Sequence, residues 1–174
     1  VEVLDKGGNT IAEVTAIVRV VDSTPQFVVA NPAKKQPEAK DSVTPGEYPD
    51  DTTFEYKTPV DTTTSGEKDV VVVAKLNGQP IVEVPAKVVV VDPKTQYVAA
   101  DPSKPQPDAS KSIDPEQYPD GTTFEYKTPV DTTTPGEKDV VVVAKDGDDT
   151  LVEVPTKVKV VQGYPQIVPV DEGK

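Results

Sequence analysis

The chain has 174 residues, 30 of them acidic and 18 basic, so its net charge is −12. This charge repels phosphate backbones and anionic lipid, which argues against binding to nucleic acid or contact with a membrane. Cysteine, histidine, methionine and tryptophan are absent, which excludes disulfides, thiol and imidazole catalysis and the usual zinc sites. We therefore expect no enzymatic activity, no bound cofactor, and no catalytic, cofactor-binding or metal-ligating residues.

The chain repeats itself with a period of 70 residues. Residues 48–64 return almost unchanged as residues 118–134 (118 − 48 = 70), and 45 of the 70 positions of residues 22–91 are identical in residues 92–161. Residues beyond both whole copies fit the same register. We therefore expect four segments: the last strands of a preceding repeat (1–21), two whole repeats (22–91 and 92–161) and the start of a following repeat (162–174). The chain begins with Val and shows no signal peptide, so we read it as an internal piece of a longer polypeptide.

The partial repeat at residues 1–21 comes first along the chain. Glu13, Val14, Val18, Val20 and Val21 each have an identical counterpart 70 positions later, near the end of the first whole repeat. An isolated hairpin is only marginally stable in water. We expect this segment to lean on the repeat that follows it, to fray, or to pair with another chain.

Each whole repeat is predicted to consist of β-strands. Residues 54–57 alternate apolar and charged side chains, as in a half-buried strand. Residues 70–75 and 87–91 are Val-rich runs typical of buried strands, and Asn77-Gly78 between them predicts a tight hairpin. Residues 96–100 predict one more strand. Turn residues at 132–136 separate the strands, with Gly136 free to adopt a positive φ.

One short helical turn is predicted in each repeat. Asp114 precedes Pro115, which suits the first position of a helix, and Thr44-Pro45 repeats the layout. We expect Ile113 or Val43, with the tyrosine that follows, to fix this turn to the core. About five short strands in 70 residues predict a tandem array of small, head-to-tail immunoglobulin-like β-sandwiches. The fold class is therefore all-β, and 70 residues imply that strands of the usual sandwich have been lost.

The sequence resembles the Rib domain, the Rib/alpha-like tandem repeat of Gram-positive bacterial surface proteins. The resemblance rests on Tyr118-Pro-Asp-Gly, on Phe124-Glu-Tyr-Lys-Thr-Pro-Val-Asp-Thr-Thr-Thr-Pro-Gly-Glu-Lys138 and on Val152-Glu-Val-Pro-Thr-Lys-Val158. It extends over both whole repeats and both partial ends. It implies an atypical immunoglobulin-like fold in head-to-tail arrays, secreted and held in the cell wall through regions outside this fragment. The array would project a distal domain for adhesion. The chain departs from the commoner family form in its hairpin and at Asp51, where the other copy has Gly121.

Three groups of residues are candidates for specific chemistry. Asp146, Asp148 and Asp149 could form a calcium loop, but the first copy has Leu76, Gly78 and Gln79 there, which favours a solvated hairpin. Asp61 and Asp131 stand beside threonines, and turn capping is the better interpretation than catalysis. The asparagines Asn9, Asn31 and Asn77 are not kept in the second copy, which excludes a repeated Lys–Asn isopeptide crosslink, while a Lys–Asp bond stays open.

The sequence is compatible with two functions. Phe54 and Tyr56 are two residues apart and lie on one face of their predicted strand. We expect both side chains to pack in the core and not to form a surface on which a glycan stacks. The first function is a structural stalk or spacer, in which the partners are neighbouring repeats of the same chain. The alternative is a repeat module that itself binds a host surface protein or glycan. Its candidate surface is the loop at residues 129–138, which is identical to residues 59–68 apart from Pro135.

Overall fold

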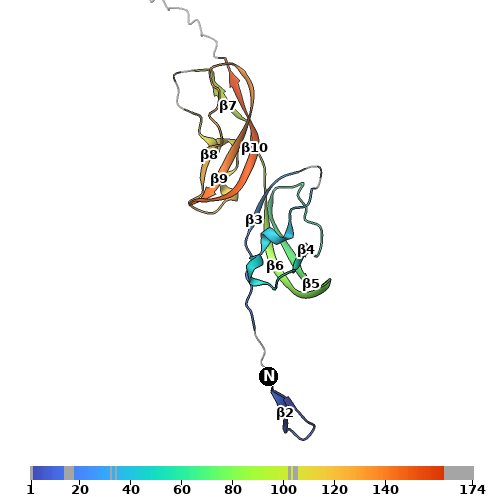
Figure 1. Ribbon diagram of the computed structural model, residues 1–174. Coiled ribbons are helices and arrows are strands. Elements are labelled where there is room, and N and C mark those ends of the chain that lie inside the picture. The colour runs from blue at the N-terminus through green and yellow to red at the C-terminus, as the bar shows by residue number, and fades with distance from the viewer. Residues whose placement is uncertain are drawn as a thin grey trace, which may run out of the picture.

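The computed structural model describes residues 2–13, 18–31, 33, 35–101, 103 and 106–162. Two four-stranded sheets follow one another along the chain, with strand orders β3-β6-β5-β4 and β7-β10-β9-β8, and a separate two-stranded hairpin precedes them (Figure 1). The elements in chain order are β1 (Glu2–Leu4), β2 (Thr10–Glu13), β3 (Gln26–Val29), η1 (Ala39–Ser42), η2 (Pro45–Glu47), β4 (Thr53–Tyr56), β5 (Gly66–Leu76), β6 (Gln79–Val91), β7 (Gln96–Ala99), η3 (Ala109–Ser112), η4 (Pro115–Gln117), β8 (Thr123–Tyr126), β9 (Gly136–Asp146) and β10 (Asp149–Val161).

A long antiparallel hairpin forms the centre of each sheet. β5 and β6 pair from Gly66↔Val90 to Leu76↔Gln79, and β9 and β10 repeat this pairing. The Val-rich runs favour extended backbone because β-branched side chains pack well on a pleated surface. Asn77 and Gly78 both have positive φ, of 51° and 77°, as a type I′ hairpin turn requires. The predicted hairpin is confirmed, and its strands run well beyond the valines that indicated them.

The first and last strands of each repeat lie side by side and run in the same direction. β3 pairs with the end of β6 from Gln26↔Val88 to Val29↔Val91, and β7 pairs with β10 in the same way. Because the two strands are parallel, β3 runs toward the end of the sheet at which β6 ends: Gln26 pairs with Val88 and Val29 pairs with Val91. The chain therefore enters a repeat at one end and leaves it at the other, which is the geometry of a head-to-tail array.

Short 3₁₀ turns cover one face of each sheet in place of a second full sheet. Val43 and Tyr48, which flank η2, are 4% and 6% exposed and pack against Val72, Ala74 and Val84 of the sheet. An isolated antiparallel bridge, Ser23↔Val43, is the only strand pairing of this layer among the described residues. The predicted fold class is confirmed: the chain is all-β, with small, strand-depleted immunoglobulin-like domains in tandem.

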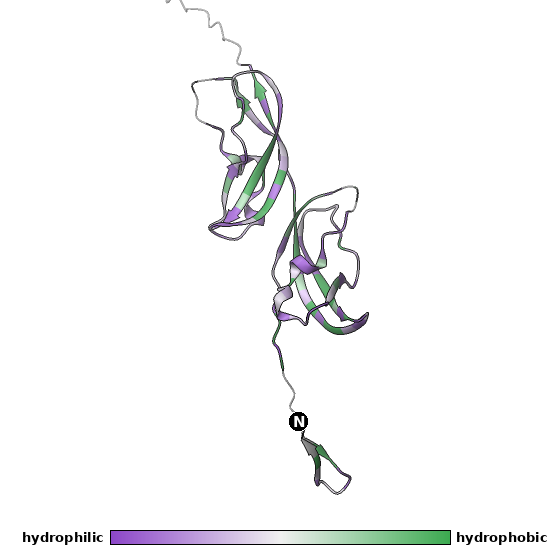
Figure 2. Ribbon diagram, viewed as in Figure 1, coloured by the Kyte–Doolittle hydropathy of each residue, from purple (hydrophilic) through white to green (hydrophobic). Residues whose placement is uncertain are grey.

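The expected turn at η2 and η4 is present, and the role given to Val43, Ile113 and the tyrosines that follow them is confirmed. The expected count of about five short strands is wrong. The described residues of each repeat form four strands, and two of these, such as β5 and β6 with 11 and 13 residues, are longer than the short strands expected. Figure 2 shows hydrophobic residues along these long strands.

A buried polar network ties the first strand to the rest of its repeat. In the first repeat, the Tyr56 hydroxyl donates to Gln26 Oε1 at 2.7 Å, and Ser42 Oγ lies 2.7 Å from the same hydroxyl. Gln96, Ser112 and Tyr126 repeat the arrangement in the second repeat. Ser42 and Ser112 are fully buried. Each network joins three elements through satisfied hydrogen bonds, which fixes their relative positions.

Candidate functional site: the junction between repeats

The last strand of the first repeat contributes to two hydrophobic cores at once. Successive side chains of a strand point to opposite faces. Val88 and Val90 face the core of their own repeat, where they cluster with Val60. Val89 and Val91 point the other way and join a cluster made mainly of residues from the second repeat. A strand with apolar residues on both faces can therefore hold two domains together.

The second repeat receives this strand on the face covered by its 3₁₀ turns. The receiving residues that are buried in the shared cluster are Ala109, Ile113, Tyr118, Val142, Ala144 and Val154. Phe27 of β3 stacks on Tyr118, with ring centroids 5.6 Å apart and an interplanar angle of 3°. On its other side Tyr118 meets Phe124 edge to face, at 5.1 Å. β3 of the first repeat also lies against β10 of the second.

The same positions at the end of the second repeat show what the junction covers. Val91 is 1% exposed, whereas its counterpart Val161 is 40% exposed. Tyr97, the counterpart of the half-buried Phe27, is 66% exposed. Equivalent strands carry these residues in both repeats. A second repeat follows the first, and its presence accounts for the difference in burial.

The segment before the first repeat occupies the equivalent place on that repeat. Val21, 70 positions before Val91, packs against the cluster that contains Tyr48. Arg19 donates to the backbone carbonyl of Glu47 at 3.4 Å, and the Glu47 carboxylate accepts from the Asp22 amide at 3.0 Å. The expectation that this segment leans on its neighbour is confirmed for Arg19 and Val21 only. Val18 and Val20 are exposed, and β1 and β2 pair with each other in a separate sheet. Residues 14–17 of the expected partial repeat lie outside the described residues.

Burial at the junction changes the acidity of its tyrosine. Desolvation, and after it the nearby negative charge of Asp114, raises the pKa of Tyr118 to about 12. Burial likewise raises the pKa of Tyr48, with a smaller contribution from the charge of Glu47. Both hydroxyl oxygens are buried without a hydrogen-bond partner. These tyrosines therefore act at the junction through their rings, as neutral side chains.

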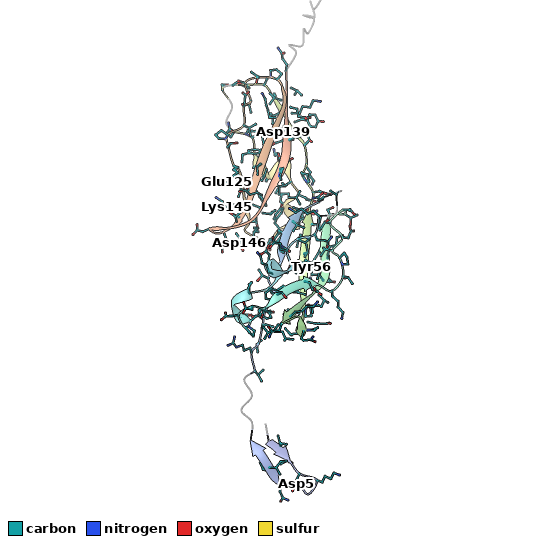
Figure 3. The ribbon with its side chains drawn as sticks, turned by 45° about the vertical axis from the view of Figure 1, so that its right-hand side comes forward. Asp5, Tyr56, Glu125, Asp139, Lys145 and Asp146 are labelled. Carbon is teal, nitrogen blue, oxygen red and sulfur yellow. The ribbon has the colours of Figure 1, made fainter. Side chains whose placement is uncertain are left out.

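The three aspartates that could form a calcium loop lie at the tip of the β9–β10 hairpin. Asp146, Asp148 and Asp149 are all exposed, and Figure 3 shows Asp146 next to Lys145, which forms an ion pair with Glu125. Among the described residues, no group of three or more acidic, His or Cys side chains is arranged to hold a metal ion. The expectation that the chain has no catalytic, cofactor-binding or metal-ligating residues stays a prediction.

Asp131 organises a surface turn, as predicted for a capping residue. Its carboxylate accepts from the Thr133 amide at 2.9 Å and from the Thr133 hydroxyl at 2.6 Å, and Lys138 Nζ lies 2.8 Å away. The bond from Lys138, followed by those from the two threonine hydroxyls, holds the pKa of Asp131 well below its usual range. Hydrogen bonds from Thr63 and Thr64 lower the pKa of Asp61 in the same way. Lys138 and Asp131, partly exposed, form an ion pair here.

Phe54 and Tyr56 lie in the core, as predicted. Phe54 meets Tyr48 edge to face with ring centroids 4.9 Å apart, and Tyr56 forms the buried network with Gln26 and Ser42. Sequence reasoning missed that network and the second face of β6. One signal for the network was present: Gln26 and its counterpart Gln96 are identical although the residues on either side of them differ.

The described part of the chain contains no helix that is long and apolar enough to cross a bilayer. The fold and its junctions define a class of protein: an array of small immunoglobulin-like β-repeats joined head to tail. The sequence model of the Rib domain matches residues 22–92 and again residues 91–162. The chain therefore belongs to the Rib domain family of Gram-positive surface proteins, which is a structural repeat family and not an enzyme family.

Two solved structures are similar to the chain. A Rib structure from Streptococcus pyogenes is 30% identical, with a TM-score of 0.35, and the match covers 41% of this chain and 90% of that one. A human mucin-like protocadherin is 10% identical, with a TM-score of 0.25, and the match covers 85% of this chain and 100% of that one. Comparison with curated proteins finds no match.

Proposed function

We propose that this segment is a structural stalk, a spacer built from repeats that projects an adhesive domain away from a Gram-positive cell. It is secreted and anchored to the cell wall through regions outside this sequence. The proposal includes the division into a partial repeat at 1–21, whole repeats at 22–91 and 92–161, and a partial repeat at 162–174. The observation that carries it is the shared core of the junction, where Val91 is 1% exposed.

A shared core limits bending between repeats. Val89 and Val91 belong to the strand that ends the first repeat, and only residues 92–95 separate that strand from β7. Bending at this point would expose Val91 and separate Phe27 from Tyr118, which is unfavourable because apolar surface returns to water. Two repeats in line would span on the order of 50–80 Å at ~3.3 Å per strand residue.

The strand pairing also suits a chain under tension. The ends of a surface stalk are pulled apart when the distal domain is held. Tension on one repeat pulls β3 toward its start at Gln26 and β6 toward its end at Val91. Since these strands are parallel, the pull slides one along the other and loads their hydrogen bonds together.

A second candidate function is direct binding of a host protein or glycan by the repeats. The loop at residues 129–138 favours it, because it is largely exposed and almost identical to residues 59–68. Asp131 and its threonines give this loop a defined shape. The same identity follows from recent duplication of one repeat, so the spacer is the better supported function.

Small-angle X-ray scattering of the whole chain tests the spacer. An elongated particle whose largest dimension fits two repeats in line is the expected result. A compact, folded-back particle would contradict it. The alternative is tested with a glycan array and host-protein capture, in which the variant Asp131→Ala is compared with Asp139→Ala, whose side chain is also exposed. Saturable binding that only Asp131→Ala abolishes would replace the spacer with the binding module.

A further inference from the structure

One position at the end of the repeats carries a different side chain each time it occurs. It is Arg19 in the preceding segment, Val89 in the first repeat and Lys159 in the second, at intervals of 70 residues. Val89 is 8% exposed and faces the second repeat. Arg19 contacts the first repeat through the carbonyl of Glu47. Lys159 is exposed, and its ammonium lies 5.8 Å from the centre of the Tyr97 ring.

One position of the receiving repeat, at the end of its second 3₁₀ turn, also differs between the two copies. The first repeat has Glu47 at the end of its 3₁₀ turn, and the second has Gln117. Arg19 therefore meets a repeat with an acid, and Val89 meets a repeat with a neutral amide. The Oε1 atom of Gln117 is buried without a hydrogen-bond partner. A carboxylate in that place would be a desolvated, unpaired charge, which is far more costly than an unpaired amide oxygen.

Beside a cation, a carboxylate is favoured over an amide. The Glu47 carboxylate accepts a hydrogen bond from the Asp22 amide, and Arg19 contacts the backbone carbonyl of the same residue. The hydrogen bond from Arg19 goes to the backbone carbonyl, but the negative charge of the carboxylate on the same residue attracts the guanidinium as well, which a neutral amide would not do. Arg19 thus reaches the repeat that carries the acid, through a backbone carbonyl, and Val89 packs against the repeat that carries the neutral amide.

We propose that the array contains two kinds of junction that alternate, and that the exposed face at Tyr97, Lys159 and Val161 docks a repeat of the 22–91 type, with Glu at the position of Glu47. This inference rests on the proposed function, since it assumes that repeats dock head to tail. The first repeat receives a cation and presents Val89. The second receives Val89 and presents a cation. A following repeat that matches Lys159 must again carry the acid.

Two positions after the second repeat agree with this alternation, whereas Asp171 matches Asp101 of the second repeat and not Asn31 of the first. Residues 165–167 read Pro-Gln-Ile, and the equivalent positions are Pro-Gln-Phe at 25–27 and Thr-Gln-Tyr at 95–97. The following segment thus shares its proline, and an apolar residue after the glutamine, with the first repeat and not with the second. The position of Phe27 is also the one that stacks on the next repeat. Repeats that present Val89 would therefore also present an apolar ring or chain beside it.

Two extended arrays test the proposal. Each contains residues 1–161, followed directly by a second copy of either residues 22–91 (matched) or residues 92–161 (mismatched). Hydrogen exchange is measured at the Ala100 amide, which donates to the Val161 carbonyl at 2.8 Å. The Ala30 amide, which donates to the Val91 carbonyl at the closed junction, is the reference within the same molecule.

The matched array should slow exchange at Ala100 toward that at Ala30. The mismatched array should exchange about two- to five-fold faster than the matched one at low salt, as expected for a partly exposed ion pair, and the difference should shrink in high salt. Glu47→Gln in the added copy should remove the advantage of the matched array. Lys159→Val should restore protection in the mismatched array.

Equal protection of Ala100 in both arrays at low salt would overturn the two kinds of junction and leave the stalk intact. No added protection from either array would overturn this inference and head-to-tail docking together. Protection that does not change with Glu47→Gln would show that the carboxylate is not what selects the partner, and would also overturn the inference.

Discussion

Val91 and Val161 end the last strands of two repeats that share most of their sequence, yet one is buried and the other is 40% exposed. The strands pair in the same register in both repeats. What differs is the neighbour: a whole repeat covers Val91. The first repeat of this chain therefore does not cover its own apolar surface completely, because the second repeat covers the part around Val91.

The largest expected effect is that of a charge placed in the closed junction. Val91→Asp should lower the free energy of unfolding by roughly 3 kcal/mol, because it buries an unpaired carboxylate. Urea denaturation of the whole chain measures this. The matched control is Val161→Asp at the exposed position, which should cost less than about 0.5 kcal/mol. Similar losses in the two variants would mean that the junction does not stabilise the chain.

The aromatic contact across the junction should give the next largest effect. Phe27→Ala removes the ring that stacks on Tyr118. Because Phe27 is only half-buried, we expect a loss of roughly 1–2 kcal/mol, less than for a fully buried phenylalanine. Tyr97→Ala at the open end should lie within about 0.5 kcal/mol of the unsubstituted chain. The comparison fails if Tyr97→Ala proves as damaging as Phe27→Ala.

Alkaline pH should weaken the junction through Tyr118. Its pKa is about 12 in the folded chain, whereas an unfolded tyrosine ionises near pH ~10. The unfolded chain therefore binds fewer protons between these values. This contribution to stability is complete below about pH 10 and is lost as the pH rises to 12. Tyr118→Phe should flatten the loss of stability in that window, as measured by urea denaturation at several pH values. Identical slopes for the two chains would contradict the burial of this hydroxyl.

The smallest effect should come from the ion pairs across the outer face of the sheet. Lys87 pairs with Glu67, and Lys157 pairs with Glu137, at side chains about half exposed. Exposed pairs of this kind contribute little because water and salt screen them. Lys87→Ala and Lys157→Ala should leave the unfolding transition almost unchanged, and equally so in both repeats. A clear loss in only one of them would mean that surface charge, and not the shared core, distinguishes the two repeats.

Much of the fold could be predicted from local patterns. The Val runs, Asn77-Gly78 and the Asp-Pro turn each act over a few residues, so they indicated the hairpin, the 3₁₀ turn and the positions of the strands, but not the number or the length of the strands. The parallel pairing of β3 with β6 joins residues about 60 apart, and no local pattern encodes it. The turn around Asp131 was predicted because an aspartate and the threonines that follow it bond locally.

The junction was harder to predict because apolar and polar residues do not alternate along the strand that forms it. Residues 88–91 read Val-Val-Val-Val, which is typical of a buried strand but does not say what covers each face. The contrast with Val-Lys-Val-Val at residues 158–161 held the missing information. One face of the strand is apolar in both repeats and covers its own core. The other face differs at one position, where Val89 is replaced by Lys159.

The central claim is that consecutive repeats form one stiff body through a shared core. Residual dipolar couplings, measured by nuclear magnetic resonance on the weakly aligned chain, test it most directly. The claim predicts that the amides of residues 22–91 and of residues 92–161 fit a single alignment tensor. Two tensors of clearly different magnitude, one for each repeat, would show that the repeats move independently and would contradict it.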